Sequence, residues 1–292
     1  MRLGCGWLVV VVVACGLVTA CGSGSNGNSG PEAGAGDSDS AADSPGEGGS
    51  GEAGPGPNEG GTGDGGSDSG THPPYQGFVL LYSDATPFYS LTVSFYPYGS
   101  SSCPMALGSC CYYPPASASG PSPTTGTISV VDGTSAIVTI QETDAGYSYN
   151  NVAAWMPGDT LAFSSVGDVV HAFNGSVKAP QPLLGVSPPP AATPTMIPIS
   201  SNLVIGWSAG SSSTLVAVEL SSMKNGMSDG TIMCTFTDTG SGSVPASALA
   251  HLTAGDTGSL YVFRLSRSTA TCNNTDVTVE VGSVVGQSVA FQ

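Results

Sequence analysis

Short runs of alternating apolar and polar residues fill the chain from Tyr75 to its C-terminus. Apolar residues two positions apart lie on one face of a β-strand. Helical spacing is nearly absent, and only "PASALAHL" (245–252) reads as a short connecting helix. The sequence therefore predicts an all-β fold. The alternating sets are Leu91-Val93-Phe95, Ile128-Val130, Val138-Ile140, Leu203-Ile205-Trp207, Val216-Val218-Leu220, Ile232-Cys234-Phe236 and Val277-Val279-Val281.

Two changes of composition divide the chain. Residues 22–71 contain 18 Gly and nine acidic residues, and they lack Leu, Ile, Val and aromatic residues. Such a segment cannot bury enough apolar surface to offset the entropy of ordering, so residues 21–74 are expected to form a disordered acidic Gly/Ser linker. Prolines are dense across 179–198, and proline disrupts strand pairing. We therefore expect a connector at 181–194 between two β-sandwich domains, 75–180 and 195–292.

The second of these domains has about a hundred residues, a tryptophan (Trp207) inside an early strand, and about six expected strands. In this architecture it resembles fibronectin type III and immunoglobulin-like domains. The resemblance is one of layout and carries no family-specific motif. The first domain is expected to be another sandwich, with longer loops.

The N-terminus has the layout of a secretory signal peptide: Arg2, then an apolar core across 8–14, then small residues. The sequence Val18-Thr19-Ala20-Cys21 resembles the lipobox of bacterial lipoproteins. That resemblance implies that residues 1–20 are removed and that Cys21 carries the lipid. The alternative is an uncleaved membrane anchor, which Gly4, Gly6 and the lack of following positive charge disfavour.

The resemblance to lipoproteins also implies where the protein lies. Gly22 stands where an Asp commonly retains Gram-negative lipoproteins in the inner membrane, so the outer membrane is expected, by way of the lipid on Cys21. The formal net charge of the chain is −16, with only five Lys and Arg residues, and no basic stripe exists. Nucleic-acid binding is therefore not expected. No motif for a cofactor or a metal occurs, and none is expected.

Five cysteines remain once Cys5 and Cys15 leave with the signal peptide and Cys21 is acylated. Export favours disulfides. Cys234 and Cys272 lie in the same expected domain and are predicted to pair. In "CPMALGSCC", Cys103 is expected to pair with Cys110 or Cys111. One thiol of that segment is then left over.

Two segments match the nucleophile elbow G-x-S-x-G of α/β-hydrolases, "GWSAG" (206–210) and "GMSDG" (226–230). Ser208 would be the nucleophile of the first, with His251 and either Asp229 or Asp238. An elbow requires a helix directly after the serine, whereas "SSSTLVAVEL" resumes strand-like alternation. In a chain so rich in Gly and Ser such matches arise by chance, and an enzyme is not expected.

Nine of the ten tyrosines fall between residues 75 and 149. In "CCYYPP", Tyr112 and Tyr113 are candidates for an exposed aromatic patch that stacks on sugar rings or binds a protein. Filling of a β core is the alternative. The sequence thus predicts a lipid-anchored envelope protein displaying β-sandwich modules for binding or envelope structure, with a glycan or an envelope protein as partner. The alternatives are an anchored carbohydrate-binding protein and a secreted serine hydrolase.

Overall fold

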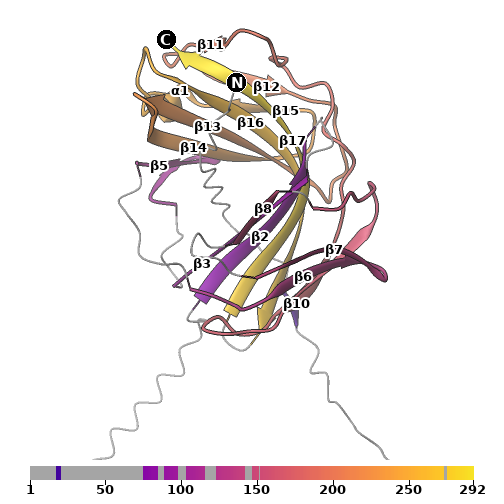
Figure 1. The fold of residues 1–292 in the computed structure, drawn as a ribbon. Coiled ribbons are helices and arrows are strands. Elements are labelled where there is room, and N and C mark those ends of the chain that lie inside the picture. The colour runs from indigo at the N-terminus through magenta and orange to yellow at the C-terminus, as the bar shows by residue number, and fades with distance from the viewer. Residues whose placement is uncertain are drawn as a thin grey trace, which may run out of the picture. The chain divides into compact units, whose positions relative to one another are not determined.

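The structure is a computed structural model, and it describes residues 18–20, 75–84, 89–97, 103–115, 123–141, 147–150, 152–272 and 275–292 (Figure 1). Most of the expected signal peptide, Cys21 and the linker lie outside the described residues. So does the side chain of Cys272.

The described residues form strands almost throughout, which confirms the all-β prediction. The single helix among them is α1 (Ala246–Leu249), inside the segment expected to be helical. All seven alternating sets overlap strands. The strands are β1 (Val18–Ala20), β2 (Tyr75–Ser83), β3 (Tyr89–Pro97), β4 (Met105–Leu107), β5 (Cys110–Tyr113), β6 (Ile128–Asp132), β7 (Ser135–Ile140), β8 (Tyr147–Asn150), β9 (Thr160–Ser165), β10 (Asn174–Lys178), β11 (Thr195–Ile197), β12 (Leu203–Gly206), β13 (Leu215–Lys224), β14 (Met227–Thr237), β15 (Ser241–Val244), β16 (Thr257–Cys272) and β17 (Thr275–Phe291).

These strands form three sheets. The largest has 11 strands, with β4-β5-β14-β13-β16-β17-β2-β3-β8 in spatial order; in addition β1 pairs with β16 and β11 pairs with β17. A four-stranded sheet has the order β10-β9-β6-β7, and β12 pairs with β15. Most neighbours are antiparallel, but β2 and β11 each run parallel to β17. Asn225 and Gly226 both have positive φ, 51° and 80°, and they make the two-residue turn between β13 and β14.

Two hydrophobic cores lie against one face of the large sheet. The first core lies between that sheet and the four-stranded sheet, and it includes Trp155, Phe163 and Phe173. The second is closed by β11, β12, β15 and α1, and it includes Trp207 and Phe291. A third, smaller buried cluster, with Phe263 and Met233, occupies the opposite face of the large sheet. The body is therefore a sandwich of sheets, as predicted.

The long β16–β17 hairpin belongs to both cores. Along β17, Val277, Val279 and Val281 pack in the first core, whereas Val289 and Phe291 pack in the second. Strand β2, from the first expected domain, lies directly beside β17 (Figure 1). The expectation of two separate domains divided at 181–194 is corrected here, because strands from both sides of that connector share one sheet. The connector is a boundary in sequence and not in hydrogen bonding.

Candidate functional site

A buried ion pair between Asp238 and Arg264 organises the region where the second core meets residues 178–184. Asp238 follows the end of β14, and Arg264 lies in the middle of β16. The Nε of Arg264 donates to Oδ2 of Asp238 at 2.7 Å, and Nη2 donates to Oδ1 at 3.2 Å. The side chain of Arg264 is only 3% exposed, and that of Asp238 is 0% exposed. This bidentate geometry is the strongest form of an Arg–carboxylate contact.

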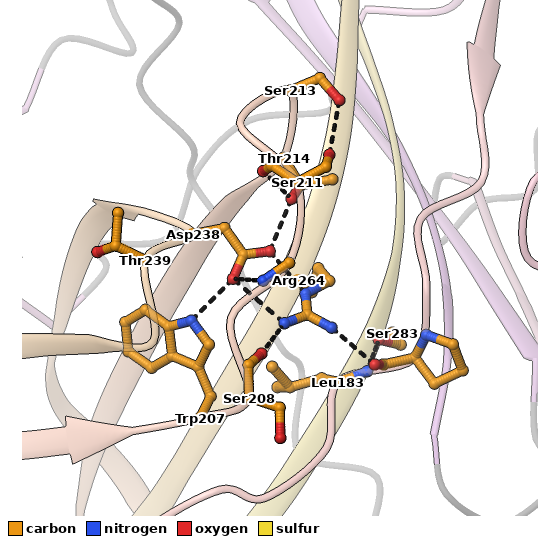
Figure 2. A network of polar contacts seen from close by, with 12 residues as sticks. Leu183, Trp207, Ser208, Ser211, Ser213, Thr214, Asp238, Thr239, Arg264 and Ser283 are labelled. Carbon is orange, nitrogen blue, oxygen red and sulfur yellow. Dashed lines mark hydrogen bonds and ion pairs between the residues drawn. The ribbon is translucent and has the colours of Figure 1, made fainter.

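Three further groups donate to Asp238 (Figure 2). The indole Nε1 of Trp207 is 2.8 Å from Oδ1, the main-chain N of Gly210 is 3.1 Å from the same oxygen, and Oγ1 of Thr214 is 2.6 Å from Oδ2. Burial acts to raise the pKa of the Asp238 carboxyl. The hydrogen bonds from Arg264 and Thr214, the charge of Arg264 and the bond from Trp207 outweigh burial, so the pKa lies below its ordinary value.

Gly210 leaves the space that this packing needs. A Cβ at residue 210 would lie 2.0 Å from Oδ2 of Asp238 and 3.0 Å from Nε of Arg264. Such distances exclude a side chain unless the ion pair moves. The loop between β12 and β13 therefore closes over Asp238 because it carries a glycine there.

Arg264 also ties together segments far apart in sequence. Its Nη1 donates to the carbonyl of Pro182 at 2.7 Å, and Nη2 donates to the carbonyl of Ser208. A guanidinium has five N–H groups. Contacts to Asp238, Pro182 and Ser208 account for four of them, and one N–H on Nη1 has no partner among the described residues.

A crevice of about 350 Å³ opens beside this network. Its walls come from Gly158 before β9, the end of β10, the segment after β10, the β12–β13 loop and β16. Lys178 and Arg264 are the cationic side chains of the lining. The polar neutral side chains of the lining are those of Gln181, Ser211, Ser213, Thr214 and Ser266. The crevice therefore combines positive charge with hydroxyl and amide groups.

A larger hollow of about 580 Å³ lies on β6, β9 and β10 beside residues 268–270 of β16. Its lining is formed by small, hydroxyl, amide and apolar residues, without a charged side chain. Strand β1 pairs in parallel with β16 at Thr269–Thr271, next to this hollow. The smaller crevice is the better candidate for recognition, because it has charged groups that can orient a ligand.

Tyr112 and Tyr113 do not form a shared aromatic platform, which corrects the expectation from the sequence. They are consecutive residues of β5, so their side chains point to opposite faces of the sheet. Tyr112 packs against the second core and stacks on His251, with ring centroids 4.8 Å apart. Tyr113 packs against the third cluster.

The disulfides confirm one expected pairing and correct the other. Cys103 bonds to Cys111, one of the two alternatives. Cys234 bonds to Cys110, so the predicted Cys234–Cys272 bond is wrong. The reason is strand pairing, since β5 lies beside β14 and puts Cys110 directly opposite Cys234. All three cysteines of "CPMALGSCC" are thus bonded, and no thiol is left over there.

The residues of the nucleophile-elbow match lie in different surroundings. Ser208 is followed by a loop and then by β13, without a helix. Its carbonyl faces Arg264 in Figure 2. His251 packs on Tyr112, and Asp229 accepts a hydrogen bond from Thr253 at 2.9 Å. Among the described residues, no hydrogen bond joins Ser208 to His251 or joins His251 to Asp229 or Asp238.

Two more acidic residues are buried. Glu219, in β13, is 2% exposed, and its Oε2 has no hydrogen-bond partner among the described residues. Burial raises the pKa of Glu219 to about 8. Glu280, in β17, is 0% exposed and accepts from Nε of Arg267 at 2.6 Å. Burial raises the pKa of Glu280 more than Arg267 lowers it.

Sequence reasoning missed Arg264, Lys178 and Glu219. A signal for Arg264 was present, because it continues the alternation of Leu260 and Val262 in "LYVFRL" and so falls on a core-facing position. A cation at such a position requires a buried partner. Lys178 carries no comparable signal, because its place in the crevice depends on contacts across the chain.

Comparison with known proteins leaves the family open. No protein-family model and no curated protein matches the sequence. Among solved structures, the fibronectin(III)-like modules of Clostridium thermocellum CbhA match over 72% of this chain and 89% of theirs, at 11% identity and a TM-score of 0.18. A likeness this distant supports no conclusion about this chain beyond what its own strands show.

Proposed function

We propose that this protein is a lipid-anchored bacterial cell-envelope protein whose β-sandwich body binds or supports an envelope component, without catalysis. The observation that carries the proposal is Cys21, preceded by Val18-Thr19-Ala20 at the end of an apolar segment. Two or three acyl chains on one cysteine hold a protein stably on a bilayer, whereas a single chain is marginal. Among the residues that the structure describes, no helix is long and apolar enough to cross a membrane.

In this proposal the fifty residues 22–71, which lie outside the described residues, are the spacer between lipid and body. A Gly-rich coil of fifty residues would span roughly 35–42 Å on average. The body beyond it is stabilised by two disulfides and a buried ion pair. A covalently braced β body on a long spacer suits an exported protein that presents a surface. Since Gly22 follows Cys21, the outer membrane is the proposed location.

Metabolic labelling with a palmitate analogue in a bacterial host tests the anchor. The full-length chain should take up the label and separate with the membrane fraction, and Cys21→Ser should abolish both. Cys15→Ser is the matched control, because it removes a thiol from the same apolar segment and should leave labelling unchanged. Labelling of the Cys21→Ser variant at the level of the unmodified chain contradicts the proposal.

A further inference from the structure

We propose that the crevice beside Arg264 binds an oxyanion, a carboxylate or a sulfate-like group, through Lys178 and the remaining N–H of Arg264. This assigns a ligand class to the binding role proposed above and rests on that role, but it is independent of the lipid anchor. Every residue involved belongs to 158–266.

Basic side chains are scarce in this body, and two of the four line the crevice: Lys178, and Arg264, whose charge is balanced by Asp238. Residues 75–292 contain twelve acidic residues and four basic ones, Lys178, Lys224, Arg264 and Arg267. Arg267 is paired with Glu280, and Lys224 lies at the β13–β14 turn. The acidic residues elsewhere are screened beyond roughly 8 Å at physiological ionic strength, so an anion in the crevice responds mainly to nearby groups.

The nearby acidic groups already have partners. Asp238 lies behind Arg264, and its two oxygens accept five hydrogen bonds. Asp159 follows Gly158 of the crevice wall, and its Oδ2 accepts from the main-chain N of Met156 at 2.5 Å. The ammonium of Lys178, by contrast, has no ion pair or hydrogen bond among the described residues. The charge of Lys178 is therefore available to a ligand.

Arg264 is a preorganised donor. Four of its N–H groups are held by Asp238, Pro182 and Ser208, which fixes the guanidinium in place in the crevice lining. A planar guanidinium N–H and an ammonium together suit the oxygens of a carboxylate, sulfate or phosphate. Ser211 and Ser213 contact each other at 2.8 Å between their Oγ atoms, and with Gln181 and Ser266 they offer hydroxyl and amide groups to the rest of a ligand. About 350 Å³ is the size of a small-molecule pocket.

The chain contains only two lysines, Lys178 and Lys224, which makes a direct test feasible. Reductive methylation of the full-length chain with ¹³C-formaldehyde gives one dimethyl-lysine NMR signal for each. Sulfate, galacturonate and galactose are titrated separately at constant ionic strength. We expect the Lys178 signal to shift saturably with at least one of the two anions and to be unmoved by galactose, while the Lys224 signal stays nearly still.

The separate titrations with sulfate and galacturonate distinguish a free inorganic ligand from one carried on a sugar. Saturation with sulfate alone points to a free inorganic oxyanion, and saturation with galacturonate points to a carboxylate carried on a sugar. Equal shifts of both lysine signals, no saturable shift with either anion, or a response to galactose each overturn the proposal. These outcomes leave the Cys21 labelling result untouched, so failure of the crevice and failure of the anchor are distinguishable.

Calorimetry on unmodified protein gives the second readout. Lys178→Gln should weaken binding of the active anion about threefold to fivefold, since it removes one charged contact from a partly solvated site. Lys224→Gln is the matched control and should leave the affinity unchanged. Because Lys178 is exposed, its variant should keep the melting temperature of the parent, and equal affinities of the two variants contradict the proposal.

Discussion

Replacing Glu219 by Gln should change how the stability of the body depends on pH. Glu219 is 2% exposed, and its Oε2 has no partner among the described residues. Burial raises the pKa of its carboxyl from 4.5 to about 8. Between these values the folded chain holds a proton at Glu219 that the unfolded chain has lost. Unfolding releases that proton, so a rise in pH through this window favours the unfolded chain.

The size of the effect follows from the width of the window. One proton released on unfolding lowers the free energy of unfolding by about 1.4 kcal/mol for each pH unit. Across the interval from 4.5 to about 8, the loss reaches about 5 kcal/mol. A glutamine has nearly the same shape and does not titrate. Glu219→Gln should therefore remove this slope, and its advantage over the parent should grow from pH 5 to pH 8.

Urea unfolding of the oxidised chain at pH 5, 6, 7 and 8 measures the effect. Glu280 also has a raised pKa, but it contributes equally to both proteins and cancels in their difference. The parent measured in the same series is the reference, because Glu219→Gln removes one ionisable group and leaves all the others in place. Parallel stability curves for the parent and Glu219→Gln across this range refute the reasoning.

Three other predictions concern the buried ion pair, the glycine beside it and the disulfide between β5 and β14. Asp238→Ala should lower the free energy of unfolding by about 3–5 kcal/mol in urea denaturation, since it leaves Arg264 buried without its partner, and a loss below about 1 kcal/mol contradicts this. Gly210→Ala should cost about 1–3 kcal/mol in the same assay, because its Cβ would meet Asp238; an unchanged midpoint would show that the loop yields freely. Peptide mapping without reductant should recover Cys110 linked to Cys234, and replacing both by Ala should cost about 2–5 kcal/mol, whereas a Cys234–Cys272 peptide would disprove the pairing.

The sequence predicted local structure well because each strand carries its own pattern. The alternation at Val216-Val218-Leu220 and at Ile232-Cys234-Phe236 identifies β13 and β14 without knowledge of their partners. The Asn225-Gly226 pair also marks the turn between them. These signals span only a few residues, so a single sequence displays them.

The pairing of strands that are far apart in the sequence could not be predicted from local patterns. Nothing in β2 indicates that it runs parallel to β17, and nothing in β5 indicates that it lies beside β14. Both errors about organisation follow from this, since the first pairing joins the two expected domains and the second puts Cys110 opposite Cys234. The crevice combines residues from β10, the β12–β13 loop and β16, so it too depends on contacts that the local pattern does not encode.

The parallel pairing of β2 with β17 has a mechanical consequence. Both strands run from the Tyr75–Thr275 end to the Ser83–Ser283 end, and β17 continues to Phe291. A pull between the N-terminal side of Tyr75 and the C-terminus draws the two strands lengthwise in opposite directions. Their interstrand hydrogen bonds then share the load at once instead of opening one after another. The body therefore resists extension best when the force acts along the line from Tyr75 to Phe291.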